Sequence, residues 1–336
     1  MNPLHQQHQW PVLTPQLTAE QINSQTGRDA LDSLWQQASC IRLSSRDQLS
    51  LCLWQLPAPE QPQAALIIVP GRIEASHKYA ELCLDARNAG YQVFVLDHRG
   101  QGLSQRLCAN PQIGVVHRFD DYADDLALAI RAICERSSLP LLAIAHSMGS
   151  AILYRYLQLT PDTPVLKAVC CAPMFGIPVG PLPALVRGLS HSISWLNQVC
   201  GAAPWFVPGQ QPYQRWPFAG NDLTHCEARY NWFRDLYDRY PAYQLGGVSW
   251  HWLAAALTAC TLLSLAAKPT PAVLVVQAGK DQVVDNHAQH KLVQQHQLAF
   301  ARIGTARHEL WAGTDAERTQ LCASINQFLT GDSGSA

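Results

Sequence analysis

Short, continuous apolar runs alternate along the chain with longer stretches whose apolar positions recur every three or four residues. The first pattern predicts strands and the second predicts helices. Strands are expected at residues 40–43, 49–56, 65–69, 93–96, 139–145, 165–171, 272–277 and 300–303. Helices are expected at residues 18–36, 76–89, 119–134, 147–159, 285–298 and 316–329. Because most of these strands are apolar on both faces and alternate with helices, they predict an α/β fold: a mostly parallel sheet with helices on both faces.

One long segment, 177–265, interrupts this alternation. Residues 168–214 contain a single Lys, Arg, Asp or Glu, which is Arg187, and six of the ten tryptophans lie between positions 195 and 252. Two interpretations stay open: a helical subdomain with its own aromatic core, or a lid that exposes apolar surface to an apolar substrate or a membrane. The expected organisation is an N-terminal arm (1–37), a core (38–176 and 266–330), the inserted lid (177–265) and a polar tail (331–336).

The composition excludes several classes of protein. The 336 residues include 24 basic and 25 acidic ones. This balance leaves no excess of positive charge of the kind that binds nucleic acid or anchors a protein to acidic lipids. The N-terminal residues have no apolar signal-peptide region, and no stretch is a convincing membrane span. The 11 cysteines are odd in number and include no Cys-x-x-Cys pair, which predicts reduced thiols in the cytoplasm, with neither a disulfide framework nor a zinc site.

The strand at 139–145 runs through Ala145, His146, Ser147, Met148 and Gly149 directly into a helix. A serine between small residues on a tight strand-to-helix turn is the nucleophile-elbow pattern, here with Ala145 at the usual first glycine. Such a turn exposes the hydroxyl at the end of the sheet, above the N–H groups of the helix. Simple N-capping would also explain a serine here, but the buried strand before Ser147 favours a nucleophile.

A serine nucleophile needs a histidine as its base and an acid that orients the histidine. In proteins with a nucleophile elbow, the acid comes after the serine along the chain and the histidine comes last. Asp281 lies just after the strand at 272–277. Asp285 is the alternative acid, although N-capping of the next helix is sufficient to explain it. His308 lies between the last strand and the last helix, at the carboxyl edge of the sheet. We therefore predict a triad of Ser147, Asp281 and His308.

The oxyanion of an acyl-transfer intermediate needs N–H donors. We expect them from the backbone of Met148, after the nucleophile, and of Arg72, in the loop after the strand at 65–69. The Arg72 side chain either points to solvent or meets an anionic group of the substrate. The lid residues Trp195, Trp205 and Trp252 are further candidates for substrate contact. This chemistry requires no cofactor and no metal.

From residue 66 to residue 329 the chain resembles bacterial lysophospholipases of the monoacylglycerol-lipase group. The resemblance lies in residues 70–74, 77–82, 97–102, 145–149 and 172–176 and, in the lid, in Asn221, Leu223, Thr224, His225, Arg229, Tyr230, Gly246, Gly247 and Trp252. It implies an α/β-hydrolase fold with an inserted helical lid, the triad and oxyanion donors named above, an acyl-glycerol ester substrate and loose association with the inner membrane. Pro70 stands where the wider group has a histidine.

These observations predict a serine ester hydrolase that removes the fatty acyl chain from lysophospholipids through an acyl-enzyme. The expected partners are a lysophospholipid or monoacylglycerol and a membrane surface reached through the lid, with no nucleic acid. A monoacylglycerol lipase and a general carboxylesterase are the alternative enzymes. The alternative outside the enzymes is a silent hydrolase-fold protein that only binds lipid.

Overall fold

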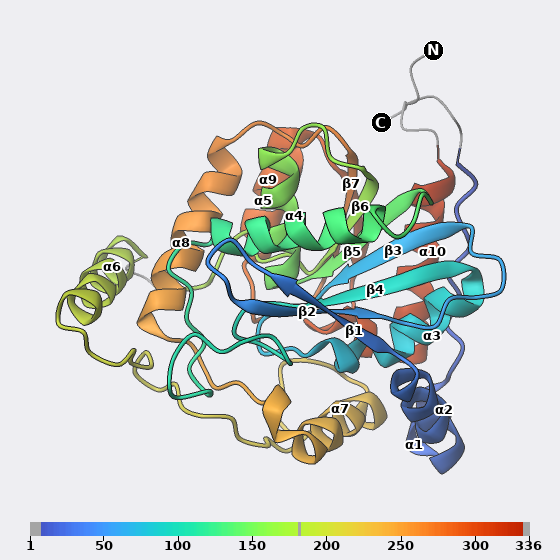
Figure 1. Ribbon diagram of the computed structural model, residues 1–336, viewed down its shortest axis with the longest axis horizontal. Coiled ribbons are helices and arrows are strands. Elements are labelled where there is room, and N and C mark those ends of the chain that lie inside the picture. The colour runs from blue at the N-terminus through green and yellow to red at the C-terminus, as the bar shows by residue number, and fades with distance from the viewer. Residues whose placement is uncertain (1–7, 181–182, 332–336) are drawn as a thin grey trace.

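The computed structural model describes residues 8–180 and 183–331, with an eight-stranded sheet at its centre (Figure 1). The strands are β1 (Ser39–Ser44), β2 (Ser50–Gln55), β3 (Ala64–Val69), β4 (Tyr91–Asp97), β5 (Leu141–His146), β6 (Val165–Cys171), β7 (Ala272–Ala278) and β8 (Ala299–Ile303). Their order is β1-β2-β4-β3-β5-β6-β7-β8. The pairs β1–β2 and β2–β4 are antiparallel and the other neighbours are parallel. The predicted mostly parallel sheet is confirmed.

Helices cover both faces of this sheet. The α-helices are α1 (Ala19–Asn23), α2 (Gln25–Gln36), α3 (Ala80–Ala89), α4 (Asp120–Cys134), α5 (Met148–Leu159), α6 (Pro183–Val199), α7 (Glu227–Arg239), α8 (Trp250–Leu265), α9 (Asn286–His296) and α10 (Asp315–Thr330). The described residues also form the short 3₁₀ helices η2 (Ser76–Tyr79), η3 (Pro241–Tyr243) and η4 (Leu310–Ala312). Helices α2, α3, α7 and α10 contribute to one core, and α4, α5, α8 and α9 to the other.

The central strands are apolar on both faces because successive side chains enter opposite cores. In β3, Leu66 and Ile68 pack into the core of α3 and α10, whereas Ile67 and Val69 pack into the core of α4 and α5. All six residues of β3 are buried. This double burial fixes the strand register, and with it the point at which each strand ends and its loop begins.

The N-terminal helix expected at 18–36 is two helices. Ser24 adopts an extended conformation that ends α1, and its hydroxyl accepts the Gly27 N–H at the start of α2. The described part of the segment predicted as an arm lies against the core. Trp10 and Leu13 are buried there, and the Leu13 N–H donates to Asn326 of α10. Of the predicted polar tail, residues 332–336 lie outside the described residues.

The expectation that every cysteine is reduced is wrong. Cys40 and Cys52 form a disulfide between the adjacent antiparallel strands β1 and β2, with a Cα–Cα distance of 5.6 Å. The two cysteines are 12 positions apart, and only the pairing of the strands brings them together. An odd total count therefore carried no information about this pair.

The segment predicted as the lid contains α6, α7 and α8. Helix α7 joins one main core and part of α8 joins the other, while Trp250, Leu253 and Leu257 of α8 form a small separate cluster with Val186 and Ile193 of α6. Helix α6 packs on α8 and lies at the periphery of the molecule, beyond α8 from the sheet (Figure 1). Arg187 is the single charged residue of α6, which contains no Lys, Asp or Glu. Within the described ranges, no helix combines the length and the apolar character needed to span a membrane.

Candidate active site

Ser147 lies on the turn between β5 and α5, with φ +52° and ψ −118°. A positive φ is costly for a residue with a Cβ, and hydrogen bonds on both sides hold it in place. The Ser147 N–H donates to the Cys171 carbonyl at 2.9 Å, and the Met174 N–H donates to the Ser147 carbonyl at 3.0 Å. Gly149 must be glycine, because a Cβ there would lie 2.1 Å from the Val69 carbonyl oxygen. The sharp turn therefore depends on close contact between α5 and β3.

Three predicted residues from distant parts of the chain form one hydrogen-bonded chain. His308 Nε2 lies 3.0 Å from Ser147 Oγ, and His308 Nδ1 lies 2.7 Å from Asp281 Oδ2. Ser147 and His308 are buried, at 8% and 4% exposure, yet both line the main cavity. A serine hydroxyl, an imidazole and a carboxylate in this order can generate a nucleophile by general-base catalysis.

Asp285 lies outside this chain of contacts. Its carboxylate accepts the N–H groups of His287 and Ala288 and caps the N-terminus of α9. Asp281 instead follows β7, and its other oxygen, Oδ1, accepts the N–H groups of Val283 and Val284. These two bonds fix the Asp281 carboxylate in the orientation that presents Oδ2 to His308.

The loop after β3 brings Arg72 beside the elbow. On either side of it the Gly71 N–H donates to Glu74 and the Ile73 N–H donates to Gln101. Pro70 stands at the position where the wider group has a histidine. Its carbonyl oxygen accepts a hydrogen bond from His98 Nε2 at 2.9 Å. Met148 is the first residue of α5, where a helix has no internal acceptor for its N–H. Arg72 and Met148 line the same cavity as Ser147, so their backbone N–H groups stay the predicted oxyanion donors.

The Arg72 side chain lies against the lid instead of extending into solvent. Its Nη2 donates to the Gly247 carbonyl at 2.5 Å, and its guanidinium lies 4.7 Å from the ring centroid of Trp252. Burial lowers the pKa of Arg72 to about 10. The Arg72 side chain therefore connects the loop after β3 to the lid.

The main cavity has a volume of about 450 Å³, which suits a small-molecule ligand. Of the three tryptophans predicted to touch substrate, Trp252 lines it. Trp195 and Trp205 do not line it, and their side chains are 64% and 51% exposed. Trp216, which the sequence did not single out, lines the cavity. Further apolar lining comes from Met174, Ile177, Leu223, Phe233, Leu245, Val248, Val283 and Val284.

Two arginines give the cavity a positive character. Arg72 and Arg234 both line it, and within the described residues neither forms an ion pair with a carboxylate. The Arg234 guanidinium lies over the rings of Tyr230 and Phe233, at 4.9 and 5.1 Å, and its Nε has no hydrogen-bond partner in the part of the chain that the structure describes. No local sequence pattern indicated Arg234, because its position on α7 reaches the cavity only in the folded chain.

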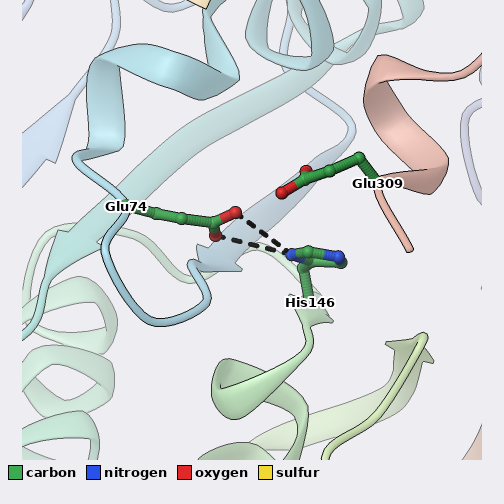
Figure 2. Close-up of side chains that lie close together, drawn as sticks. All are labelled: Glu74, His146 and Glu309. Atoms are coloured by element: carbon green, nitrogen blue, oxygen red, sulfur yellow. Dashed lines mark hydrogen bonds and ion pairs between the residues drawn. The ribbon is translucent and has the colours of Figure 1, made fainter. Parts of the chain in front are cut away.

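A buried charged cluster lies directly beside the proposed triad and was also missed. It consists of Glu74, Lys78, His146 and Glu309 (Figure 2 shows the two glutamates and the histidine). His146 and Glu309 are the chain neighbours of Ser147 and His308, but nothing in a single sequence indicates that they are buried against Glu74. Burial alone would raise the pKa of Glu74, but Lys78 and His146 outweigh it and lower that pKa well below its usual range.

Comparison with known proteins places these features in a family. The family model described as "Serine aminopeptidase, S33" matches residues 60–315. "Lysophospholipase L2" of Escherichia coli (strain K12) is 32% identical over 314 residues, which cover 89% of each chain. "Probable lysophospholipase L2" of Haemophilus influenzae is 34% identical over 293 residues, covering 85% of this chain and 90% of its own.

Solved structures agree on the fold. A soluble variant of monoglyceride lipase from Saccharomyces cerevisiae has a TM-score of 0.65 at 15% identity, covering 87% of this chain and 94% of its own. A thermostable carboxyl esterase from Bacillus coagulans also has a TM-score of 0.65, at 18% identity, covering 88% and 98%. At this level of identity the likeness concerns the fold alone.

Proposed function

The chain belongs to the hydrolase family described as "Serine aminopeptidase, S33", in the group of the lysophospholipase L2 proteins, and we propose that it removes the acyl chain from lysophospholipids. It is a carboxylic ester hydrolase with the α/β-hydrolase fold. One observation carries the choice of substrate. The cavity that contains Ser147 and His308 joins apolar walls to two arginines that have no carboxylate partner among the described residues.

In the proposed reaction Ser147 is the nucleophile and His308 is its general base. Ser147 Oγ attacks the ester carbonyl carbon while His308 Nε2 takes the hydroxyl proton, and His308 then gives that proton to the leaving alcohol. Water next attacks the acyl-enzyme through the same base and releases the fatty acid. Asp281 keeps Nδ1 protonated and stabilises the imidazolium. The distances of 3.0 and 2.7 Å along this chain support these roles.

Charge on the tetrahedral intermediate develops on the former carbonyl oxygen. The backbone N–H groups of Met148 and Arg72 are the proposed donors to that oxygen. Removing one preorganised donor of this kind from an enzyme costs about 3–4 kcal/mol. The contacts that hold Gly71, Ile73 and Gly149 support such preorganisation, because they fix both backbone segments before substrate binds.

The same cavity separates the two ends of the proposed substrate. Its apolar residues, including Trp216 and Trp252, would bury the acyl chain, with about 0.8 kcal/mol gained for each buried CH₂. Arg72 and Arg234 would attract the phosphate of the head group. Lys78 contributes little net charge, because its ammonium already lies 2.6 and 2.7 Å from the carboxylates of Glu74 and Glu309.

An aminopeptidase, as in the printed description of the family, fits this cavity less well. Such an enzyme needs a carboxylate that is free to bind the ammonium of a peptide N-terminus. Glu74 and Glu309 are the acidic residues that line the cavity in the described ranges, and both already bind Lys78. The arginines would repel a cationic substrate, which again favours an anionic ester.

Arg234→Met is the test of head-group recognition. We expect it to lower kcat/KM for a lysophospholipid by about tenfold or more, since a hydrogen bond to a charged group contributes about 1.5–3 kcal/mol. Hydrolysis of a monoacylglycerol with the same acyl chain should change far less, because its head group is neutral. Rates on both substrates, measured over several chain lengths, give the comparison.

The matched control is Arg215→Met. Arg215 belongs to the same lid but pairs with Asp235 and Asp238 and does not line the cavity, so both rates should stay at the wild-type level. Arg72→Met is a less selective probe, because it also removes the contacts with Gly247 and Trp252. Equal losses on both substrates in Arg234→Met would leave a general monoacyl-ester lipase as the better description.

We further propose that the outer face of the lid contacts a membrane surface. Helix α6 packs Val186 and Ile193 inward against α8. Its opposite face exposes Leu185, Leu189, Trp195, Leu196 and Val199, and Trp205 and Trp216 of the lid are also exposed. A large apolar patch that is exposed to water is unfavourable unless a partner or a lipid surface covers it. A lipid surface, from which the substrate comes, matches this patch in chemistry.

The double variant Trp195→Ser/Val199→Ser should bind neutral phospholipid vesicles more weakly than the wild type in a flotation assay. High salt should release little wild-type protein, whereas mild detergent should release it, because apolar contact is not screened. Leu159→Ser replaces an exposed apolar residue at the end of α5, outside the lid, and serves as the control. Absence of wild-type binding to vesicles at low salt would refute membrane contact.

A further inference from the structure

Four charged side chains are buried together behind the Ser147–His308 pair. Lys78 Nζ lies 2.6 Å from Glu74 Oε1 and 2.7 Å from Glu309 Oε1. His146 Nδ1 lies 3.3 Å from Glu74 Oε1, and His146 Nε2 lies 3.1 Å from the backbone carbonyl oxygen of His308. The His146 side chain is 2% exposed, and its ring centroid lies 4.8 Å from that of His308. This arrangement (Figure 2) connects the cluster to the proposed base.

Both ring nitrogens of His146 face oxygen atoms that can only accept a hydrogen bond. The His308 carbonyl has no hydrogen to donate. Glu74 is an ionised acceptor, because it already receives hydrogen bonds from the Gly71 N–H, the Tyr79 hydroxyl and the Lys78 ammonium. A neutral imidazole would turn a lone pair towards one of these oxygens, whereas an imidazolium donates to both.

The cluster does not suit a metal ion, although Glu74, His146 and Glu309 have ligand atoms within 4.8 Å of one another. The Lys78 ammonium already bridges the two carboxylates. A metal would have to displace this cation and would also require a neutral His146 that has lost one of its two hydrogen bonds. The charges are instead balanced by the protein itself, with two carboxylates against one ammonium and one imidazolium.

We propose that His146 is a positioning residue, held as an imidazolium by Glu74, that fixes the His308 backbone by donating to its carbonyl and sets the proton affinity of the His308 ring through its charge. This role rests on the proposed function, in which His308 is the base. The charge of His146 faces Glu74, Lys78, Glu309 and the hydroxyls of Tyr79 and Tyr237 around the cluster, while Asp281 faces His308 from its other side.

The direction of the electrostatic effect follows from the charge count. With His146 protonated, the charges of Glu74, Lys78, His146 and Glu309 sum to zero. In a variant without the His146 charge, the charges of the cluster sum to −1, which favours the protonated form of His308. As the pH falls, the base is then protonated and inactivated at a higher pH than in the wild type. Without the Glu309 charge the cluster sums to +1, which has the opposite effect.

The decisive experiment is the pH profile of kcat/KM for a soluble ester in His146→Gln and Glu309→Gln. The acidic limb of such a profile reports the proton affinity of the free base. We expect this limb to move to higher pH in His146→Gln and to lower pH in Glu309→Gln, each by about one pH unit. A merely structural role would lower the rate in both variants without shifts of opposite sign. Identical limbs in all three proteins would overturn the proposal.

A second readout does not depend on activity. Burial would lower the pKa of His146, but the charges of Glu74 and Glu309 raise it to about 9, above the ordinary value near 6.5. The stability that this proton contributes is therefore fully present below about pH 6.5 and is lost as the pH rises through 9. The free energy of unfolding should fall with pH across this window in the wild type, and this contribution should be missing in His146→Gln.

His287→Gln supplies the matched control, since it makes the same substitution at an exposed position on α9. It should leave both the pH profile and the stability curve unchanged. The two hypotheses fail separately in these experiments. If Ser147→Ala retained activity, the proposed function would fail while the stability result could still hold. If the stability curve of His146→Gln kept the wild-type slope, the charged state of His146 would be refuted without touching the hydrolase mechanism.

Discussion

Ser147→Ala is expected to abolish the hydrolysis of p-nitrophenyl esters, with kcat lowered by about 10⁴-fold or more. The Ser147 hydroxyl is the group that would form the acyl-enzyme. Its oxygen lies 3.0 Å from His308 Nε2, and alanine has no hydroxyl proton for this nitrogen to take. The elbow should keep its shape, because its backbone bonds to Cys171 and Met174 do not involve the side chain. Initial rates on a purified, folded variant measure the effect.

Labelling with a fluorophosphonate separates this mechanism from a protein that only binds lipid. The wild type should react and Ser147→Ala should not, whereas a silent hydrolase-fold protein would leave both unlabelled. Ser324→Ala, on the exposed side of α10, is the control and should behave as the wild type. Turnover near the wild-type rate in folded Ser147→Ala would disprove the role of this serine.

Asp281→Asn should lower kcat by about 10⁴-fold. The carboxylate accepts from His308 Nδ1 at 2.7 Å, and an amide there would favour the wrong tautomer and no longer stabilise the imidazolium. The two N–H groups bound by Asp281 Oδ1 can still donate to the amide oxygen, so the loop should survive the change. The same ester assay, together with a thermal unfolding curve, measures both effects.

Asp285→Asn is the matched control. Asparagine caps helices about as well as aspartate, and the contacts of Asp285 are those of an N-cap on α9. We expect activity close to that of the wild type. If Asp285→Asn lost activity while Asp281→Asn kept it, the acid role would pass to Asp285.

Local sequence was most informative where each feature is decided within a few residues. The elbow could be recognised because an apolar strand, a serine between small residues and a helix follow one another directly. The capping role of Asp285 and the stop of α3 at Gly90, with φ +112°, are equally local. The break at Ser24 was missed, because a cap in the middle of a polar stretch interrupts no clear apolar period.

By itself the sequence determined the alternation of strands and helices, and therefore the mostly parallel sheet, and it singled out Ser147, Asp281 and His308 as candidates at its carboxyl edge. Only the tertiary structure decided which distant residues meet. It paired Cys40 with Cys52 and turned Arg72 towards Trp252. It left Trp195 and Trp205 outside the cavity and buried Glu74, Lys78 and Glu309 around His146. The physical reason is that hydrophobic period, capping and turn strain act between neighbours along the chain, whereas burial and ion pairing depend on strand register and on contacts between segments that are far apart in sequence.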